Sequence, residues 1–285
     1  MRTFAILNMK GGVGKTTTAI NLAYLLATEY RHRVLLIDAD PQANATRALL
    51  HDGQDWCGLA GLLGGYATVY DEVVVSSGIP NLDVIPASDG LWEIDLRDNA
   101  MEDDAYDVMV IDCPPNFSAA CVAAINAANS IIIPVLPDAF SADGMDSLTM
   151  QIAGVRKLHP DVRVAGCLVT QWHRAGVVLD ATAYLRENSP VPVFDTVIRR
   201  TDKVLESTWV REPVQTWSPF SSAARDYRSW VKELVEKEGL NHGAPAKPSF
   251  GFVGRGDARE RVEFSPQAET EQSGLCGDEE GLGNG

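Results

Sequence analysis

The sequence predicts a doubly wound α/β fold, a mostly parallel sheet with helices on both faces. Short apolar runs alternate with longer segments in which apolar residues recur at helical spacing. The runs are apolar at almost every position, which is typical of parallel strands covered on both faces. A glycine-rich segment, residues 8–17, also lies between the first run and the first helical segment. These three observations indicate a parallel sheet with a ligand site at one edge.

The expected elements follow one another along residues 1–240. Strands are predicted at Phe4–Leu7, Val34–Ile37, Leu82–Ile85, Val108–Ile111, Ile131–Val135 and Val164–Val169. Helices are predicted at Lys15–Thr28, Ser88–Met101, Ser118–Ala128, Asp143–Leu158, Val177–Asn188, Leu205–Trp209 and Ala223–Glu238. Ligands of such sheets bind at the carboxyl ends of the strands, so functional residues are expected directly after the strands.

Residues 241–285 differ in composition from the rest of the chain. They contain nine Gly and three Pro, have no apolar periodicity and carry more acidic than basic residues. Such a segment buries too little apolar surface to offset its ordering entropy. We therefore expect one folded domain over 1–240, followed by a disordered, Gly-rich acidic tail over 241–285.

The charge balance argues against a protein that holds nucleic acid by overall charge. The chain has 24 Lys and Arg against 39 Asp and Glu, a net charge of −15. Residues 156–232, in contrast, hold 12 basic and 8 acidic residues. A polyanion contact is expected there, although a solvated face with ordinary ion pairs explains the same excess. The candidate DNA contacts are Arg174, Arg199, Arg200, Lys203, Arg211, Arg225 and Arg228.

The phosphate-binding candidate is Asn-Met-Lys-Gly-Gly-Val-Gly-Lys-Thr-Thr at residues 8–17. Glycines allow backbone N–H groups to surround phosphate oxygens, and a helix N-terminus favours the negative charge. Lys15 can reach the β- and γ-phosphates, and the Thr16 hydroxyl can bind Mg²⁺. The general G-x-x-x-x-G-K-[ST] pattern fails only at its first glycine, which is Met9 here. The alternative is a glycine-rich turn without a ligand.

Carboxylates follow two further predicted strands. Asp38 and Asp40 end the strand at Val34–Ile37, and Asp112 ends the strand at Val108–Ile111. A carboxylate at such a position can hold Mg²⁺ through water. Aspartates at strand ends are also common as helix caps and turn residues.

These motifs resemble the ParA/MinD family of deviant Walker A ATPases. Lys-Gly-Gly-Val-Gly-Lys-Thr-Thr at 10–17 is similar to the family's Walker A motif, and Ile-Asp-Cys-Pro-Pro at 111–115 to its Walker B region. Asp-Ala-Asp-Pro-Gln-Ala-Asn-Ala-Thr at 38–46 resembles a stretch typical of ParA (Soj-like) partitioning proteins. The similarity continues weakly to about residue 236.

The resemblance implies a P-loop NTPase fold and a weak, partner-stimulated ATP hydrolase. ATP and Mg²⁺ would be its cofactors, and ATP would bring two copies together as a homodimer. The dimer would bind DNA without sequence preference and drive plasmid or chromosome partitioning with a ParB-like centromere-binding protein. The implied location is the cytoplasm, on the nucleoid. The scattered cysteines without a CxxC pair agree with a reducing compartment.

The resemblance also assigns roles to residues of this chain. Lys10 would reach the partner's phosphates, Gly12 would lie at the dimer interface, and Asp40 would orient the attacking water. Thr16 and Asp112 would serve Mg²⁺, with Asp38 as a further metal-site or switch residue. The resemblance makes Lys10, Lys15 and Asp40 the catalytic residues. The residues that would contact the nucleotide are Lys10, Gly11, Gly12, Val13, Gly14, Lys15, Thr16 and Thr17. In the family a T-V-I-P-R-N segment borders the adenine, and here Arg199 replaces its proline.

The same motifs occur in superfamily members with other functions. A MinD-like membrane-cycling regulator ends in a basic amphipathic helix, whereas this chain ends in an acidic, glycine-rich segment, so no stable membrane association is expected. An accessory ATPase of a conjugative or mobile element has the same motifs as a partitioning ATPase. Trp209, Trp217 and Trp230 are expected to pack the last helices onto the core, with base stacking as the alternative.

Overall fold

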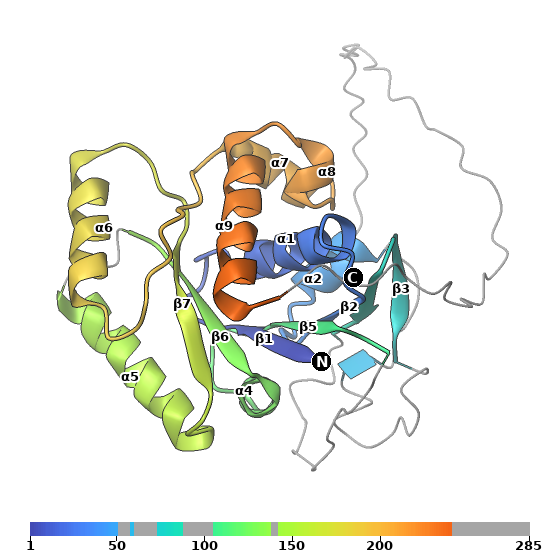
Figure 1. Cartoon of the computed structure of the whole chain (residues 1–285), viewed down its shortest axis with the longest axis horizontal. Coiled ribbons are helices and arrows are strands. Elements are labelled where there is room, and N and C mark those ends of the chain that lie inside the picture. Colours follow the sequence, from blue (N-terminus) through green and yellow to red (C-terminus); the bar gives the residue numbers. More distant parts are fainter. Residues whose placement is uncertain (51–57, 60–72, 88–104, 138–141, 241–285) are drawn as a thin grey trace, which may run out of the picture. The chain divides into compact units, whose positions relative to one another are not determined.

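The computed structural model describes residues 1–50, 58–59, 73–87, 105–137 and 142–240, all within one compact unit, Met1–Ser249. Among these residues, seven strands form a sheet in the order β3-β4-β2-β5-β1-β6-β7 (Figure 1). Every neighbouring pair is parallel except β3 and β4, which are antiparallel. The prediction of a mostly parallel sheet is therefore confirmed.

The bounds of the elements are as follows. The strands are β1 (Arg2–Ile6), β2 (Val34–Asp38), β3 (Val75–Ile79), β4 (Leu82–Ile85), β5 (Val108–Asp112), β6 (Ser130–Val135) and β7 (Arg163–Val169). The helices are α1 (Lys15–Thr28), α2 (Asn44–Leu49), α4 (Ala119–Ala127), α5 (Ala142–Leu158), α6 (Gly176–Asn188), α7 (Asp202–Trp209), α8 (Val214–Trp217) and α9 (Ser222–Glu238).

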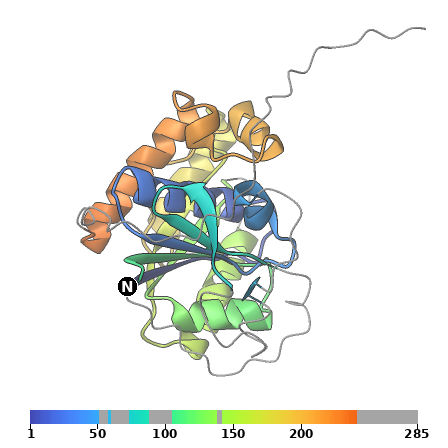
Figure 2. The same ribbon diagram turned by 90° about the vertical axis from the view of Figure 1, so that its right-hand side faces the viewer.

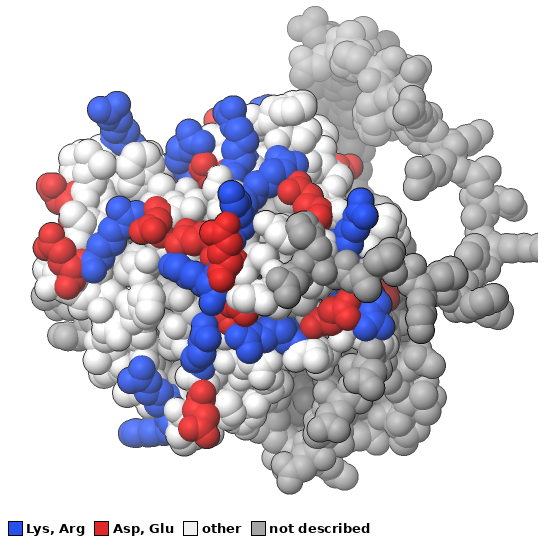
Figure 3. All heavy atoms as spheres, viewed as in Figure 1, with Lys and Arg blue, Asp and Glu red and all other residues white. Residues whose placement is uncertain are grey.

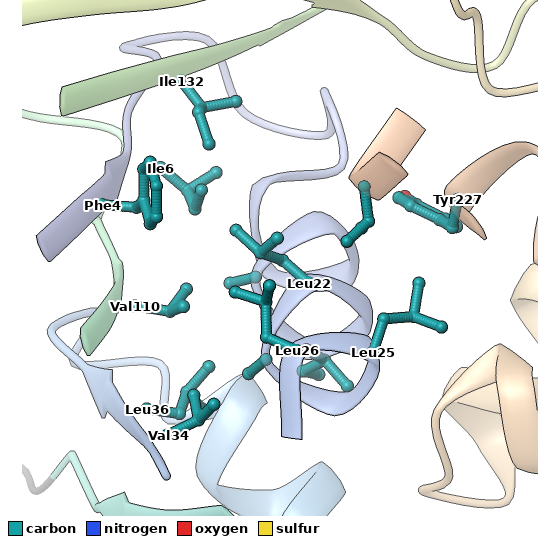
Figure 4. Close-up of a cluster of buried hydrophobic side chains, with 14 of the residues drawn as sticks. Phe4, Ile6, Leu22, Leu25, Leu26, Val34, Leu36, Val110, Ile132 and Tyr227 are labelled. Carbon is teal, nitrogen blue, oxygen red and sulfur yellow. The ribbon is translucent and has the colours of Figure 1, made fainter. Parts of the chain in front are cut away.

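Helices cover both faces of the sheet, as Figure 2 shows. Alternate strand residues point to opposite faces and enter two separate cores. Ala5 belongs to the core that includes side chains of α4 and α5, whereas Phe4 belongs to the core that includes side chains of α1 and α9. In the second core, α1 lies between the strands and Tyr227 of α9 (Figure 4). Helix α1 is buried on several sides because it is apolar on several sides.

The strand register brings the acidic strand ends together. In the sheet, β5 lies between β1 and β2. Asp112 is aligned with Ile6 of β1 on one side and with Asp38 of β2 on the other. The phosphate loop follows β1 directly, so the glycine-rich turn and both aspartates share one edge of the sheet. This is the carboxyl edge at which ligands of parallel sheets bind.

Most predicted elements are present with small shifts of their ends. The prediction for α1 matches at both ends, and the six predicted strands all form. Three short elements, α2, α8 and the antiparallel edge strand β3, were not predicted. The helix predicted at Ser88–Met101 and the tail predicted over 241–285 lie outside the described residues.

Candidate nucleotide-binding site

The phosphate loop is held in place by a buried polar residue. Asn8 donates from Nδ2 to the Pro134 carbonyl at 2.7 Å, and its Oδ1 accepts from the Lys10 backbone N–H at 2.8 Å. Gly12 and Gly14 adopt φ angles of 73° and 85°, the left-handed region in which glycine has no Cβ penalty. The loop therefore turns tightly and leads directly into the N-terminus of α1, where backbone N–H groups favour an anion.

Lys15 places a buried cation at this helix N-terminus. Its side chain is 7% exposed, and its ammonium donates to the Lys10 carbonyl at 3.1 Å. Burial lowers the pKa of Lys15, and the nearby carboxylates of Asp112 and Asp40 act in the opposite direction. An anionic ligand next to the ammonium would favour its charged form in the same way.

Asp38 and Asp112 are fully buried carboxyls on neighbouring strands. Burial raises the pKa of Asp38 to about 6, although hydrogen bonds from Thr46 and Asp40 lower it. The Thr46 N–H and hydroxyl both donate to Asp38 at 2.8 Å. Burial also holds the pKa of Asp112 well above its usual range, and the charge of Asp38 raises it further. Two acids so close in a dry site favour a nearby cation or a retained proton.

Asp40 differs from these two acids because it faces a cavity. Its carboxylate accepts from the Gln42 N–H at 2.9 Å, and the residue is 8% exposed. The cavity has a volume of about 540 Å³, within the range of small-ligand sites. Its walls include the phosphate-loop residues Gly11, Gly12, Gly14, Lys15, Thr16 and Thr17. Asp40 and the anion-binding loop thus line the same space.

The cavity wall also includes residues of the segment after β7 and of helix α7. Residues 198–201 line the cavity, together with Thr170, Gln171, Leu205 and Tyr227. This segment is the one that departs from the family's adenine-bordering motif. Arg199 is paired with Asp226 of α9, whose carboxylate accepts two bonds from its guanidinium at 2.8 and 2.7 Å and one from its backbone N–H at 2.9 Å. The arginine that replaces proline is therefore fixed by α9.

The predicted nucleotide contacts converge, with differences in exposure. Lys10 is exposed at the rim of the loop, whereas Val13 is buried beneath it and is not part of the cavity wall. Asp112 lies next to Lys15 and Thr16, and Asp38 lies beside Asp112 on the neighbouring strand. Neither of the two acids lines the cavity. Thr170 and Gln171 were missed by the sequence analysis. Their position directly after a predicted strand was the signal that could have identified them.

The basic residues proposed for DNA contact differ in whether they form ion pairs. Arg199 pairs with Asp226, Lys203 with Glu206 and Arg228 with Glu29. Arg174, Arg200 and Arg225 are exposed and form no ion pair among the described residues. Arg199 and Arg200 also line the cavity.

One packing prediction is wrong. Trp230 is fully buried, as expected, but Trp209 is 88% exposed and Trp217 is 42% exposed. The only buried residue of α7 is Ser207, so this helix turns a small side chain inward and Leu205 and Trp209 outward. Sequence pattern identifies an apolar face but not whether another element covers it.

The comparisons with known proteins agree with this site. A family model described as an AAA domain matches residues 1–164. The chromosome partitioning protein ParA of Caulobacter vibrioides is 35% identical, covering 84% of this chain and 95% of ParA. The chromosome-partitioning ATPase Soj of Thermus thermophilus is 32% identical, covering 83% of this chain and 96% of Soj. The solved cobyrinic acid a,c-diamide synthase of Mycobacterium smegmatis, with bound ATP analog and magnesium, has a TM-score of 0.70 at 26% identity, covering 84% and 96%.

The fold and the site define a P-loop protein with a deviant phosphate loop on a doubly wound sheet. The chain belongs to the ParA/MinD family of ATPases, to which the relatives named ParA and Soj also belong.

Proposed function

We propose that this protein is a Mg²⁺-dependent ATPase that dimerises on ATP and binds DNA without sequence preference. It would drive plasmid or chromosome partitioning with a ParB-like partner, in the cytoplasm and on the nucleoid. The observation that carries the proposal is the cavity in which Lys15, Thr16 and Asp40 face the same space. The similarity to ParA and Soj over more than four-fifths of the chain supports the partitioning role.

The residues at the carboxyl edge fit a magnesium–triphosphate group. Both oxygens of Asp112 are buried without a hydrogen bond of normal geometry among the described residues, and the Thr16 hydroxyl lies close enough to lower the pKa of this carboxyl. Within the described residues, no group of three His, Cys, Asp or Glu side chains forms a metal site by itself. Mg²⁺ characteristically uses one or two protein ligands, waters and substrate phosphates, which suits Thr16 and Asp112. The bound ion would neutralise charge on the phosphates.

Asp40 would orient the attacking water molecule. Its carboxylate accepts from the Gln42 N–H, and its side chain lines the cavity together with the phosphate loop. A fixed carboxylate in a water-poor site can hold an attacking water by hydrogen bonding. Lys15 would stabilise charge on the phosphates, and Lys10 at the exposed rim would reach those of the partner subunit.

Gly12 supports a face-to-face dimer. A Cβ built at this position meets no atom within 4 Å in one subunit, so the space in front of the loop is open. The φ of 73° already favours glycine here. In a dimer that meets across the cavity, the absence of a side chain would also allow close approach of the second copy.

For DNA, we propose the exposed Arg174, Arg200 and Arg225 as the first contacts to examine, ahead of the ion-paired Arg199, Lys203 and Arg228. On the face drawn in Figure 3, basic and acidic side chains are interspersed, so a DNA surface there would be limited in extent. In the described residues, no helix combines the length and apolar character needed to cross a bilayer.

The nucleotide part of the proposal is tested by ATP hydrolysis and light scattering on three proteins. Wild type with Mg·ATP should hydrolyse slowly and form a dimer. Lys15→Ala should lose nucleotide binding, and with it hydrolysis and dimer formation, because it removes the cation at the phosphate loop. Lys10→Ala should retain nucleotide binding but lose dimerisation and hydrolysis. A monomeric wild type with ATP, or a Lys10→Ala dimer, would contradict the proposed switch.

A further inference from the structure

A three-residue segment directly after β7 contacts both the phosphate loop and residues 198–200 of the cavity wall. The Thr170 N–H donates to the Val135 carbonyl at 2.8 Å. On the other side, the Trp172 N–H donates to the Ile198 carbonyl at 2.9 Å, and the Arg200 N–H donates to the Trp172 carbonyl at 2.8 Å. Between them, Gln171 has a φ of 52°, a left-handed conformation that is uncommon for a residue with a Cβ.

This segment also holds two consecutive carbonyls of the phosphate loop. The Thr170 hydroxyl donates to the Val13 carbonyl at 2.8 Å, and Gln171 Nε2 donates to the Gly12 carbonyl at 2.8 Å. Thr170 is buried and Gln171 is exposed, and both residues line the cavity. Neither residue was assigned a role by the phosphate-loop motif.

Because a peptide unit is planar, holding its carbonyl also fixes the direction of its N–H group. In a planar trans peptide the C=O and the N–H point in opposite directions. Fixing the carbonyls of Gly12 and Val13 therefore directs the N–H groups of Val13 and Gly14 away from the Thr170–Gln171 segment. Backbone N–H groups of such a glycine loop are the donors that surround phosphate oxygens.

We infer that Gln171 is a positioning residue for the nucleotide site. Its side-chain amide holds the Gly12 peptide so that the following N–H faces the phosphates, and its left-handed backbone brings the amide to the loop. Strained conformations of this kind persist where surrounding contacts maintain them. The inference rests on the proposed nucleotide function and adds a residue outside the phosphate-loop motif to it.

The test compares binding of fluorescent methylanthraniloyl-ATP and methylanthraniloyl-ADP, each with Mg²⁺, to wild type and Gln171→Met. Methionine keeps the length of the side chain and removes the donor. The variant should bind both nucleotides about fivefold more weakly, the effect of losing one hydrogen bond. Gln171→Gly, which removes the donor and relieves the backbone strain, should be equally weak.

The matched control is Asn188→Leu. Asn188 also donates from an exposed side-chain amide to a backbone carbonyl, that of Tyr184 at 2.9 Å, but it lies at the end of α6 and is not part of the cavity wall. Asn188→Leu and Gln171→Met should change the thermal midpoint of the nucleotide-free protein equally, and only Gln171→Met should weaken nucleotide binding.

Wild-type affinity in Gln171→Met, or its recovery in Gln171→Gly, would overturn this inference alone. An equal loss of affinity in Asn188→Leu would also overturn it, because the effect would then be a general loss of stability. If the wild type binds neither nucleotide, the proposed function fails and this inference fails with it.

Discussion

Asp38 and Asp112 lie side by side on neighbouring strands, and both residues are completely buried. Burying an ionised carboxylate is unfavourable unless a cation or several donors compensate it. Asp38 receives hydrogen bonds from Thr46 and Asp40, which compensate part of this cost. The remaining cost is the physical reason to expect a cation at this edge of the sheet.

The unfavourable burial of the ionised Asp38 carboxylate predicts that stability depends on pH. Asp38→Asn should remove this dependence. Because burial raises the pKa of Asp38 from 3.8 to about 6, the folded protein binds more protons than the unfolded chain between these values. Stability contributed by this group is therefore complete below pH 4 and is lost as the pH rises through 6. The change in unfolding free energy caused by Asp38→Asn should therefore be more stabilising at pH 8 than at pH 4, by up to roughly 3 kcal/mol.

Urea unfolding at pH 4 and pH 8, in the presence of a chelator, measures this difference. An equal effect of Asp38→Asn at both pH values would mean that its hydrogen bonds, and not its charge, determine the contribution of Asp38.

Helices α9 and α7 differ in whether their large apolar side chains are buried. Helix α9 begins at a Ser221 cap, which accepts from the Ala224 N–H, and ends at Gly239 with a φ of 65°. Its buried face includes Trp230, which packs edge-on against Phe194 with ring centroids 5.8 Å apart. Helix α7, in contrast, turns its largest side chain to solvent. We therefore expect Trp230 to contribute to the stability of the fold and Trp209 to contribute little.

Trp230→Ala should lower the unfolding free energy by about 3–5 kcal/mol, because it leaves a cavity in the core. Trp209→Ala should change it by less than about 0.5 kcal/mol, because this side chain is 88% exposed. Chemical denaturation of both variants without nucleotide is the measurement. A large loss in Trp209→Ala would show that α7 packs differently from the structure described.

How much the sequence predicted also depends on the element. Helix α1 and the strands were predictable because their apolar patterns are local. The edge strand β3 was not, because Val75–Ile79 contains Ser-Ser-Gly and is only half-buried. The start of α7 was missed because Asp202 and Lys203 are polar, although Thr201 caps the helix by accepting from the Lys203 N–H.

The candidate site divides in the same way. The phosphate loop and the aspartates were predictable because each is a local motif at a strand end. The contact between Gln171 and Gly12 joins residues 159 positions apart, and the Arg199–Asp226 pair joins the segment between α6 and α7 to helix α9. Sequence pattern alone gives no information on such pairs.

In the whole molecule, Glu238, the last residue of α9, connects this helix to the sheet. The contact lies at the amino ends of the strands, whereas the nucleotide site lies at their carboxyl ends. The Glu238 carboxylate is buried and contacts Arg2 of β1 and Arg163 of β7. It also accepts from the Ser130 hydroxyl at 3.2 Å. One acid thus joins the C-terminal helix to the amino ends of three neighbouring strands.

Glu238→Ala should lower the unfolding free energy by about 2 kcal/mol, less than for a fully buried pair because both arginines are partly exposed. Glu236→Ala is the matched control, since Glu236 is exposed and its pair with Lys232 spans 4.0 Å. It should have no measurable effect. Equal stability of the two variants would mean that the Glu238 contacts do not hold α9 to the sheet.

In the proposed function, a nucleotide in the cavity controls binding to DNA. A DNA titration of Asp40→Ala, with ATP and then ADP, at two salt concentrations, measures this control. Because this variant should bind ATP without hydrolysing it, we predict sequence-independent binding with ATP that weakens steeply with salt and is absent with ADP. An ATP-bound dimer that does not bind DNA would contradict the partitioning role, and normal hydrolysis by Asp40→Ala would contradict the role of Asp40.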